Sequence, residues 1–279
     1  MNLQIRHTAF ETEKEFRQLV DLQNIVYQHR GLHFSTDGFR YWYKKNPVGN
    51  VVAHSAFDGN KMVAHYACIP TQMSIDGVCV NGLLSMAVVT HPDYRGHGLF
   101  TTLATKTYEL ARDLGYEFVV GVANANSFPI FMKHFPFNYI GQLDVKWGWG
   151  EIKIPNKMFS HYWTDKTIQW RTNKPKYSKY KNNIYGLYGK LPFIKTFMGE
   201  IPEQLSNGLK LKLTKHFIRP FNLYVGMGAD FSYGHYFDVP KFVKHSPFHL
   251  RFMDITPDKH LPTVNKENIV FQLIDFDVA

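Results

Sequence analysis

The chain has 279 residues, of which 44% are hydrophobic and 20% are charged, and its formal net charge is +9. These values fit a globular protein with a sizeable core, long enough for one large or two modest domains. Only Cys68 and Cys79 occur, which excludes a disulfide framework and a cysteine-rich zinc site. The positive charge favours anionic ligands, namely a phosphorylated cofactor, a nucleotide-linked substrate, nucleic acid or a membrane surface, without choosing among them.

The N-terminal residues Met1 to His7 contain no apolar signal region. No run of about 18 apolar residues occurs anywhere in the chain, so we expect no membrane span. The sequence therefore predicts a cytoplasmic protein.

The first third of the chain is predicted to form a strand, a helix pair and an antiparallel meander. Thr12 and Glu15 have capping-box spacing at the start of a helix expected over 13–28, and Asn46-Pro47 ends a second helix that begins at 35 or 36. The turn signals Asp58-Gly59 and Asp76-Gly77 separate three expected strands. The expected strands cover 3–9, 51–57, 62–75 and 78–89.

The stretch from Leu84 to Phe100 reads as a buried strand, a Pro-containing turn, a glycine-bearing loop and the first turn of a helix. The helix is predicted over 98–114, followed by a buried strand over 117–122 and a loop at 124–129 that leads into a short helix. Residues 137–147 are expected to form a closing strand. A strand-to-helix junction of this kind presents free backbone N–H groups and the positive end of a helix dipole, which suits a phosphate group.

The segment Arg95-Gly96-His97-Gly98-Leu99 resembles the Arg/Gln-x-x-Gly-x-Gly/Ala loop with which GNAT-superfamily acyltransferases hold the pyrophosphate of coenzyme A. The order of predicted elements is also similar to that of the family. The resemblance covers residues 1–148 and is strongest over 84–137. It implies an α/β fold with a mixed sheet, and a domain division into 1–148 and 149–279.

The resemblance also implies acetyl-CoA or another acyl-CoA as co-substrate. We expect no metal, because the sequence has no His-x-x-x-His on a convincing helix and no Cys/His ligand spacing. Loop amides would hold the pyrophosphate, the edge of the preceding strand would pair with the pantetheine arm, and a backbone amide near Val88 would stabilise the oxyanion during direct attack by an amine. An Asn-x-x-Ser follows one strand later, where the family often places polar contacts. The implied co-substrate residues are Ala87, Val88, Val89, Arg95, Gly96, His97, Gly98, Leu99, Phe100, Asn124 and Ser127.

The sequence departs from the family at three points. Phe100 stands where the family has Gly or Ala, and Phe131 aligns with the tyrosine that often acts as general acid. Residues 83–85 contain no carboxylate to act as a base. The catalytic residues therefore stay unassigned, and none is selected from the candidates His54, His65, His91, His134, Asp275 and Asp277.

A segment of the second half resembles a segment of the first half in sequence. Residues 168–175 resemble 39–47 when Trp170 is aligned with Trp42, at an offset of 128 residues, and strand-like runs follow. The second half is therefore interpreted as a degenerate GNAT-like repeat without the Arg-x-x-Gly-x-Gly loop, with chance similarity as the alternative. Its expected strands cover 183–187, 193–198, 222–227, 250–255 and 269–273.

Three functions are compatible with this pattern. The first is acyl transfer from acyl-CoA to the amine of a small or sugar-linked acceptor, including a nucleotide-linked amino sugar, since the two-half layout resembles GNAT-like proteins of surface-polysaccharide synthesis. The second is acylation of a peptide amine, or aminoacyl transfer from charged RNA, and the third is an inactive binding or scaffold protein. The basic run from Arg171 to Lys181 is interpreted as a solvated loop, with single-stranded nucleic acid as the alternative ligand. The sequence leaves the acyl chain length and the oligomeric state open.

Overall fold

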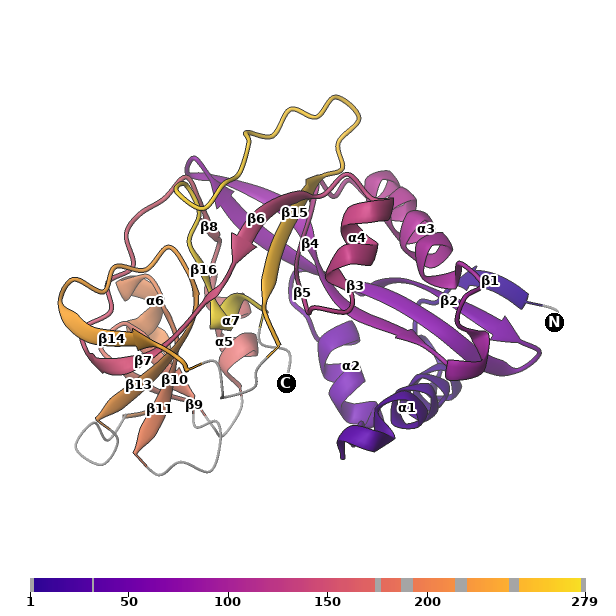
Figure 1. Ribbon diagram of the computed structural model, residues 1–279, viewed down its shortest axis with the longest axis horizontal. Helices are drawn as coiled ribbons and strands as arrows, with labels where there is room; N and C mark the ends of the chain where they lie inside the picture. Colours follow the sequence, from indigo (N-terminus) through magenta and orange to yellow (C-terminus); the bar gives the residue numbers. More distant parts are fainter. Residues whose placement is uncertain are drawn as a thin grey trace.

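The computed structural model describes residues 3–31, 33–173, 177–186, 193–213, 220–240 and 246–276. In this part of the chain, two eight-stranded mixed sheets lie next to each other, with helices packed against them (Figure 1). The α/β class and mixed sheets predicted from the sequence are confirmed.

The first sheet has the order β1-β2-β3-β4-β5-β15-β6, and β8 pairs with β3. β4 and β5 are parallel, whereas all other neighbours are antiparallel. Its strands are β1 (Leu3–His7), β2 (Val52–Asp58), β3 (Lys61–Ile75), β4 (Val78–Thr90), β5 (Phe118–Ala123), β6 (Asn138–Gln142), β8 (Phe159–His161) and β15 (His249–Asp254).

Helices cover both faces of the first sheet. α1 (Glu13–Tyr27) and α2 (Thr36–Lys44) pack into one hydrophobic cluster, and α3 (Leu99–Asp113) and α4 (Phe128–His134) pack into another. The capping box predicted at Thr12 is present: the Thr12 hydroxyl accepts from the Glu15 N–H, and the Glu15 carboxylate accepts from the Thr12 N–H. Two short 3₁₀ helices, η1 (Gln28–Arg30) and η2 (Pro92–Tyr94), complete this half.

The second sheet has the order β12-β9-β10-β11-β13-β7-β14, and β16 pairs with β13. Its helices are α5 (Asp165–Thr172), α6 (Glu203–Gly208) and α7 (Leu273–Phe276). Its strands are β7 (Asp144–Gly150), β9 (Tyr177–Tyr180), β10 (Asn183–Gly186), β11 (Ile194–Glu200), β12 (Lys212–Leu213), β13 (Phe221–Met227), β14 (Gly234–Asp238) and β16 (Phe271–Gln272).

The second sheet repeats the strand pattern of the first. β9, β10 and β11 form an antiparallel meander, β11 pairs with β13 in parallel, and β7 and β14 follow antiparallel. This is the arrangement of β2, β3, β4, β5, β15 and β6 in the first sheet. The connection from β11 to β13 contains the short α6 and β12, and its described residues, 201–213 and 220, contain no Arg-x-x-Gly-x-Gly sequence. The second half therefore repeats the strand arrangement of the first.

The two halves exchange strands, and besides the short β8, which pairs with β3, one longer strand from each half lies inside the other sheet. β15, from late in the chain, lies between β5 and β6 of the first sheet, while β7 lies between β13 and β14 of the second; the colours of Figure 1 make both exchanges visible. Three strands, β7, β8 and β15, therefore do not follow the expected boundary between residues 148 and 149.

Two strand predictions are corrected. The single closing strand expected over 137–147 is instead β6 and β7, which separate at Leu143, because the two parts pair with different sheets; the Leu143 N–H donates to the Phe248 carbonyl at 2.8 Å. The strand expected over 269–273 shortens to β16, because α7 begins at Leu273.

The aligned tryptophans of the two halves touch each other. The rings of Trp42 on α2 and Trp170 on α5 lie 5.0 Å apart edge to face, and Tyr41 stacks on Trp170 at 5.8 Å. The Tyr41 hydroxyl also donates to the Trp170 carbonyl. The two segments that resemble each other in sequence are therefore in direct contact, and α2 packs against α5 through these rings.

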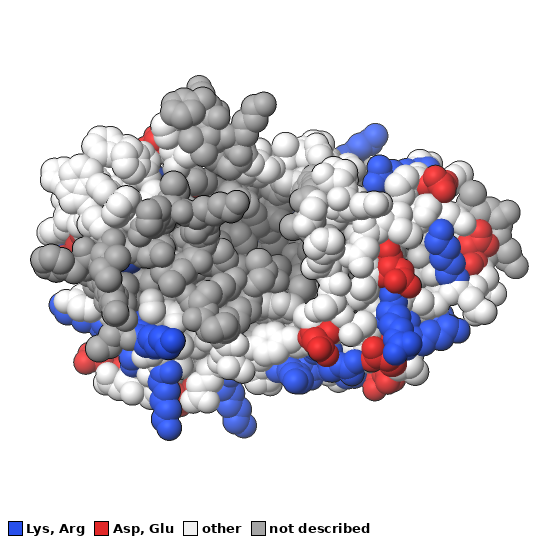
Figure 2. Space-filling model, turned by 90° about the horizontal axis from the view of Figure 1, so that it is seen from below, with Lys and Arg blue, Asp and Glu red and all other residues white. Residues whose placement is uncertain are grey.

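Figure 2 looks at the molecule from the side on which α1 and α2 lie. Lys and Arg side chains are interspersed there with Asp and Glu, and Lys44 pairs with Glu11 at 2.7 Å and Arg17 with Glu13 at 3.6 Å. Exposed pairs of this kind contribute about 0–1 kcal/mol each. Among the helices that the structure describes, none combines the length and apolar character needed to cross a membrane.

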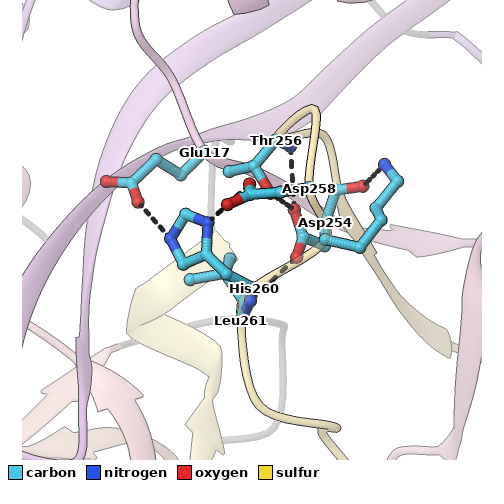
Figure 3. Close-up of polar contacts among 7 residues, drawn as sticks. Glu117, Asp254, Thr256, Asp258, His260 and Leu261 are labelled. Atoms are coloured by element: carbon cyan, nitrogen blue, oxygen red, sulfur yellow. Dashed lines mark hydrogen bonds and ion pairs between the residues drawn. The ribbon is translucent and has the colours of Figure 1, made fainter.

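The loop after β15 fastens this exchanged strand to the start of β5 (Figure 3). The Asp254 carboxylate accepts from the Thr256 N–H at 2.8 Å and from the Leu261 N–H at 3.0 Å. The His260 ring bridges Asp258 at 2.9 Å and Glu117 at 3.2 Å, and its hydrogen bond to Asp258 is the main reason that its pKa is raised. Polar contacts therefore hold the C-terminal end of β15 against the first half.

Candidate active site

A wedge opens between β4 and β5 in the middle of the first sheet. The two strands pair only from Gly82–Phe118 to Leu84–Val120 and then diverge. From Ser85 to Thr90, this edge of β4 therefore pairs with no strand among the described residues. Its backbone N–H and C=O groups are available to an extended ligand, which is the arrangement that the resemblance implies for a pantetheine arm.

A β-bulge interrupts β4 beside the wedge. Ala87 faces Ala67 on β3 and Ser85 faces Cys68, so Met86 is the extra residue. A bulge changes the direction of nearby backbone groups and often does so next to an active site. The oxyanion-stabilising amide predicted near Val88 lies two residues beyond this bulge.

The loop after β4 leaves the N-terminus of α3 uncapped by any side chain. Gly98 is the N-cap residue with φ +68°, and Gly96 has φ +80°. A Cβ atom on either glycine would meet no heavy atom within 4 Å, so glycine is required there by the backbone conformation, while the space outside is open. The N–H groups of the first helical turn have no intrahelical acceptor. These residues fit a pyrophosphate group.

The predicted co-substrate residues divide into three groups. Five of them line a cavity of about 480 Å³, the cleft cavity: Val88, Val89, Arg95, Asn124 and Ser127. Ala87 lines a second cavity beside it. The remaining five lie immediately after Arg95, in the loop and first turn of α3: Gly96, His97, Gly98, Leu99 and Phe100.

The loop between β5 and α4 has a fixed internal structure. The Asn124 side-chain oxygen accepts from the backbone N–H groups of Asn126 and Ser127, both at 3.0 Å, and from the Ser127 hydroxyl at 3.2 Å. This oxygen therefore shapes the turn that starts α4. Both residues also line the cleft cavity.

Phe100 stands where the GNAT family has Gly or Ala, and packing explains this difference. Its ring is half-buried in α3 and meets the rings of Phe131 at 4.9 Å, Tyr66 at 5.9 Å and Phe135 at 6.0 Å, each edge to face. An aromatic cluster occupies the space under the first turn of α3, and Phe100 is part of it.

A second cavity, the aromatic cavity, of about 470 Å³ lies on the α1–α2 side of the sheet. Its lining is mostly apolar and includes Phe34, Phe39 and Trp42. It shares Tyr27, Met86 and Val88 with the cleft cavity. The two cavities therefore adjoin at the β4 bulge, and together they reach from the α4 side to the α1–α2 side.

The candidate histidines line neither of the two cavities. His65 is buried between the Tyr43 hydroxyl at 3.0 Å and the Ser55 hydroxyl at 2.9 Å, and burial lowers its pKa to about 3. His54 contacts the Thr107 hydroxyl at 3.2 Å, and burial lowers its pKa to about 4. Both are neutral structural side chains at neutral pH.

The other candidates are also explained by local structure. His91 accepts from the Asp93 N–H at 3.3 Å and so caps η2, and His134 is exposed at the end of α4. Asp275 is buried in the second half, where its carboxylate accepts from the Gln272 N–H at 2.7 Å and burial raises its pKa to about 7. Asp277 lies outside the described residues.

Sequence reasoning missed a buried polar cluster at the closed end of the wedge. The Ser85 hydroxyl accepts from Arg251 Nη2 at 3.0 Å and meets the Tyr66 hydroxyl at 2.9 Å, which in turn meets the Tyr108 hydroxyl at 2.6 Å. Ser85 and Arg251 both line the cleft cavity. The sequence signal for Arg251 is a charged residue among the apolar residues of the run 250–255, but the sequence places this run in the second half.

The comparisons with known proteins agree with this architecture. Residues 7–136 match the family model described as an acetyltransferase (GNAT) domain, so this part of the chain is similar to that family. No curated protein matches the chain in sequence.

Solved structures match nearly the whole chain. A protein of unknown function and probable N-acyltransferase from Enterococcus faecalis V583 has a TM-score of 0.62 at 10% identity, covering 93% of this chain and 74% of its own. A GCN5-related N-acetyltransferase from Anabaena variabilis has a TM-score of 0.57 at 11% identity, with 92% and 74% covered. One from Kribbella flavida has a TM-score of 0.53 at 11% identity, with 90% and 71% covered. At these identities the likeness shows the fold, including its two-half extent.

Proposed function

We propose that the protein is an acyl-CoA-dependent N-acyltransferase that acts on the amine of a small or sugar-linked acceptor. The observation that carries this proposal is the uncapped α3 N-terminus next to the open β4 edge, within the part of the chain that is similar to the GNAT family. In the reaction, the acceptor nitrogen forms a bond to the thioester carbonyl carbon, the C–S bond breaks, and a proton leaves the nitrogen.

The chain's own residues have separate tasks in this reaction. Loop and helix amides from Arg95 to Phe100 hold the pyrophosphate, because the helix dipole and unpaired N–H groups favour an anion there. The β4 edge from Ala87 to Val89 orients the pantetheine arm, each hydrogen bond contributing about 1 kcal/mol net. An amide beside the bulge stabilises the oxyanion.

The aromatic cavity is our proposed acceptor side. It adjoins the cleft cavity at Met86 and Val88, so an acceptor there can reach a carbonyl at the bulge. The Phe34, Phe39 and Trp42 rings suit stacking against a sugar or another flat or apolar group. A nucleotide-linked amino sugar remains our preferred acceptor class, with peptide amines and charged RNA as the alternatives to be tested.

Calorimetry with acetyl-CoA tests the co-substrate site. We expect wild-type protein to bind, and Gly98→Val to weaken binding by about tenfold or more, which corresponds to ~1.4 kcal/mol, since a β-branched residue is strained at φ +68° and occupies the anion space. Gly77→Val is the matched control. Gly77 also has positive φ and open space, but lies in the β3–β4 turn at the other end of β4.

Release of free thiol from acetyl-CoA tests the acceptor. Amino sugars, nucleotide-linked amino sugars, polyamines, peptides and aminoacylated RNA are offered in parallel. The fastest class identifies the acceptor chemistry. Binding of acetyl-CoA without turnover on every class would favour the inactive scaffold, and no binding at all would refute the proposed function.

A further inference from the structure

Arg251 reaches the closed end of the wedge from the exchanged strand. It faces Gly121 on β5, and its Nη2 donates to the Ser85 hydroxyl on β4 at 3.0 Å. A Cβ on Gly121 would lie 2.9 Å from Ser85 Cβ and 3.2 Å from Arg251 Nη2. The absence of a side chain at Gly121 therefore leaves room for the guanidinium where β4 and β5 begin to diverge.

This guanidinium is buried and incompletely paired. Arg251 is only 1% exposed, and its Nε and Nη1 atoms have no hydrogen-bond partner. No carboxylate pairs with it among the ion pairs of the described residues. A buried cation with unpaired donors is costly unless an anion completes it, so the arrangement calls for an anionic ligand.

The groups around Arg251 are neutral. Its Cζ lies 3.4 Å from the ring centre of Phe131 and 4.1 Å from that of Phe137, and both rings attract a cation without cancelling its charge. Burial raises the pKa of Tyr66, of Tyr108 and of Cys68, the last to about 12. Among the described residues, no neighbouring anion therefore offsets the positive charge of Arg251, which lines the cleft cavity together with Ser85 and Phe131.

We propose that Arg251 stabilises the coenzyme A thiolate as it leaves, a role that rests on the proposed acyltransferase function. Breaking the C–S bond leaves its electron pair on sulfur, while the acceptor nitrogen forms the C–N bond and gives its proton to solvent. Phe131, at the position aligned with the family's frequent general acid, cannot protonate this sulfur. A fixed cation beside the same ring stabilises the sulfur anion without transferring a proton.

The test is the ionisation of coenzyme A bound to wild-type protein. Far-ultraviolet thiolate absorbance is followed against pH, with desulfo-coenzyme A subtracted, and calorimetry gives the affinity in the same buffers. We expect the bound thiol to ionise about 1–3 pKa units below free coenzyme A, as for an acid next to an opposite charge.

Two substitutions and a control locate the source of the effect. Arg251→Met removes the charge at similar length and should return the bound thiol to the free value, with acyl transfer slower by about 10- to 1,000-fold, since each pKa unit is a factor of ten. Arg251→Lys should retain part of both effects. Arg6→Met is the control, since Arg6 also lies over a ring, that of Phe57 at 4.0 Å, but on the edge strand β1.

Each outcome decides something. If coenzyme A binds but the pKa of its thiol equals that of free coenzyme A, this role is overturned and the proposed function stays intact. This measurement uses wild-type protein, so it does not depend on whether a variant folds. If the pKa of the bound thiol is still lowered in Arg251→Met, Arg251 is not the cause of the shift and the role is overturned. A failure of coenzyme A to bind wild-type protein overturns the proposed function and this role together.

Discussion

The strand exchange predicts that the first half cannot fold without β15. A chain ending at residue 148 keeps β5 and β6 but lacks the strand between them. We expect this truncated chain to show no cooperative unfolding transition. The missing strand can be reattached to β6 by a short turn, because Gln142 faces His249 and the Leu143 N–H already donates to the Phe248 carbonyl.

The size of the effect follows from the side chains that β15 buries. Leu250, Phe252 and Met253 are 0%, 3% and 5% exposed in the first sheet. At about 1.5–3 kcal/mol for each buried side chain, the truncation removes roughly 5–9 kcal/mol. A typical domain has a total stability of about 5–15 kcal/mol, so the loss consumes most of it.

The assay compares two chains by circular dichroism during urea unfolding. One is 1–148, and the other joins Leu143 to Phe248 through an Asn-Gly turn and continues to Pro262, which restores β15 as a hairpin partner of β6. We expect the joined chain to unfold cooperatively. A monomeric 1–148 chain with the same transition and stability would refute the reasoning.

Three further predictions concern single side chains. Gly121→Ala places a Cβ 2.9 Å from Ser85 Cβ and should lower the free energy of unfolding by about 1–3 kcal/mol in urea titrations; unchanged stability would contradict the close approach of β4 and β5. His260 has a raised folded pKa through Asp258, so its stabilisation is present below its unfolded pKa of about 6.5 and is lost as pH rises through the folded value. Unfolding of His260→Ala should thus differ from wild type near pH 5 more than near pH 9, and a difference independent of pH would argue against the pairing. Trp170→Ala removes ring contacts between the halves and should cost about 1–3 kcal/mol, measured by thermal unfolding; a neutral result would mean that this contact does not hold the halves together.

Elements determined by neighbouring residues could be predicted from the sequence. The capping box at Thr12 and the turns at Gly59 and Gly77, both with positive φ, are local and were located correctly. The glycine loop at Gly96 and Gly98 was likewise recognisable, because its conformation depends on those residues themselves.

Pairings between distant segments could not be predicted in the same way. Residues 137–147 contain no Pro or Gly-rich break at Leu143, and the change of sheet there depends on partners about a hundred residues away. The place of Arg251 beside Ser85 follows from that exchange, so the charge was visible in the sequence while its surroundings were not. The histidines were considered as bases because nothing local showed that His65 and His54 are held by hydroxyl groups of the core.

The exchange of β15 also sets an order of events during synthesis. β5 and β6 have been synthesised by residue 142, whereas their shared neighbour begins at His249. At about 5–20 residues per second, the two strands wait roughly 5–20 s with their facing edges unpaired. Unpaired edges recruit other strands, so the nascent chain is most exposed to misassembly in this interval, and its folding yield should depend on translation speed between these two points.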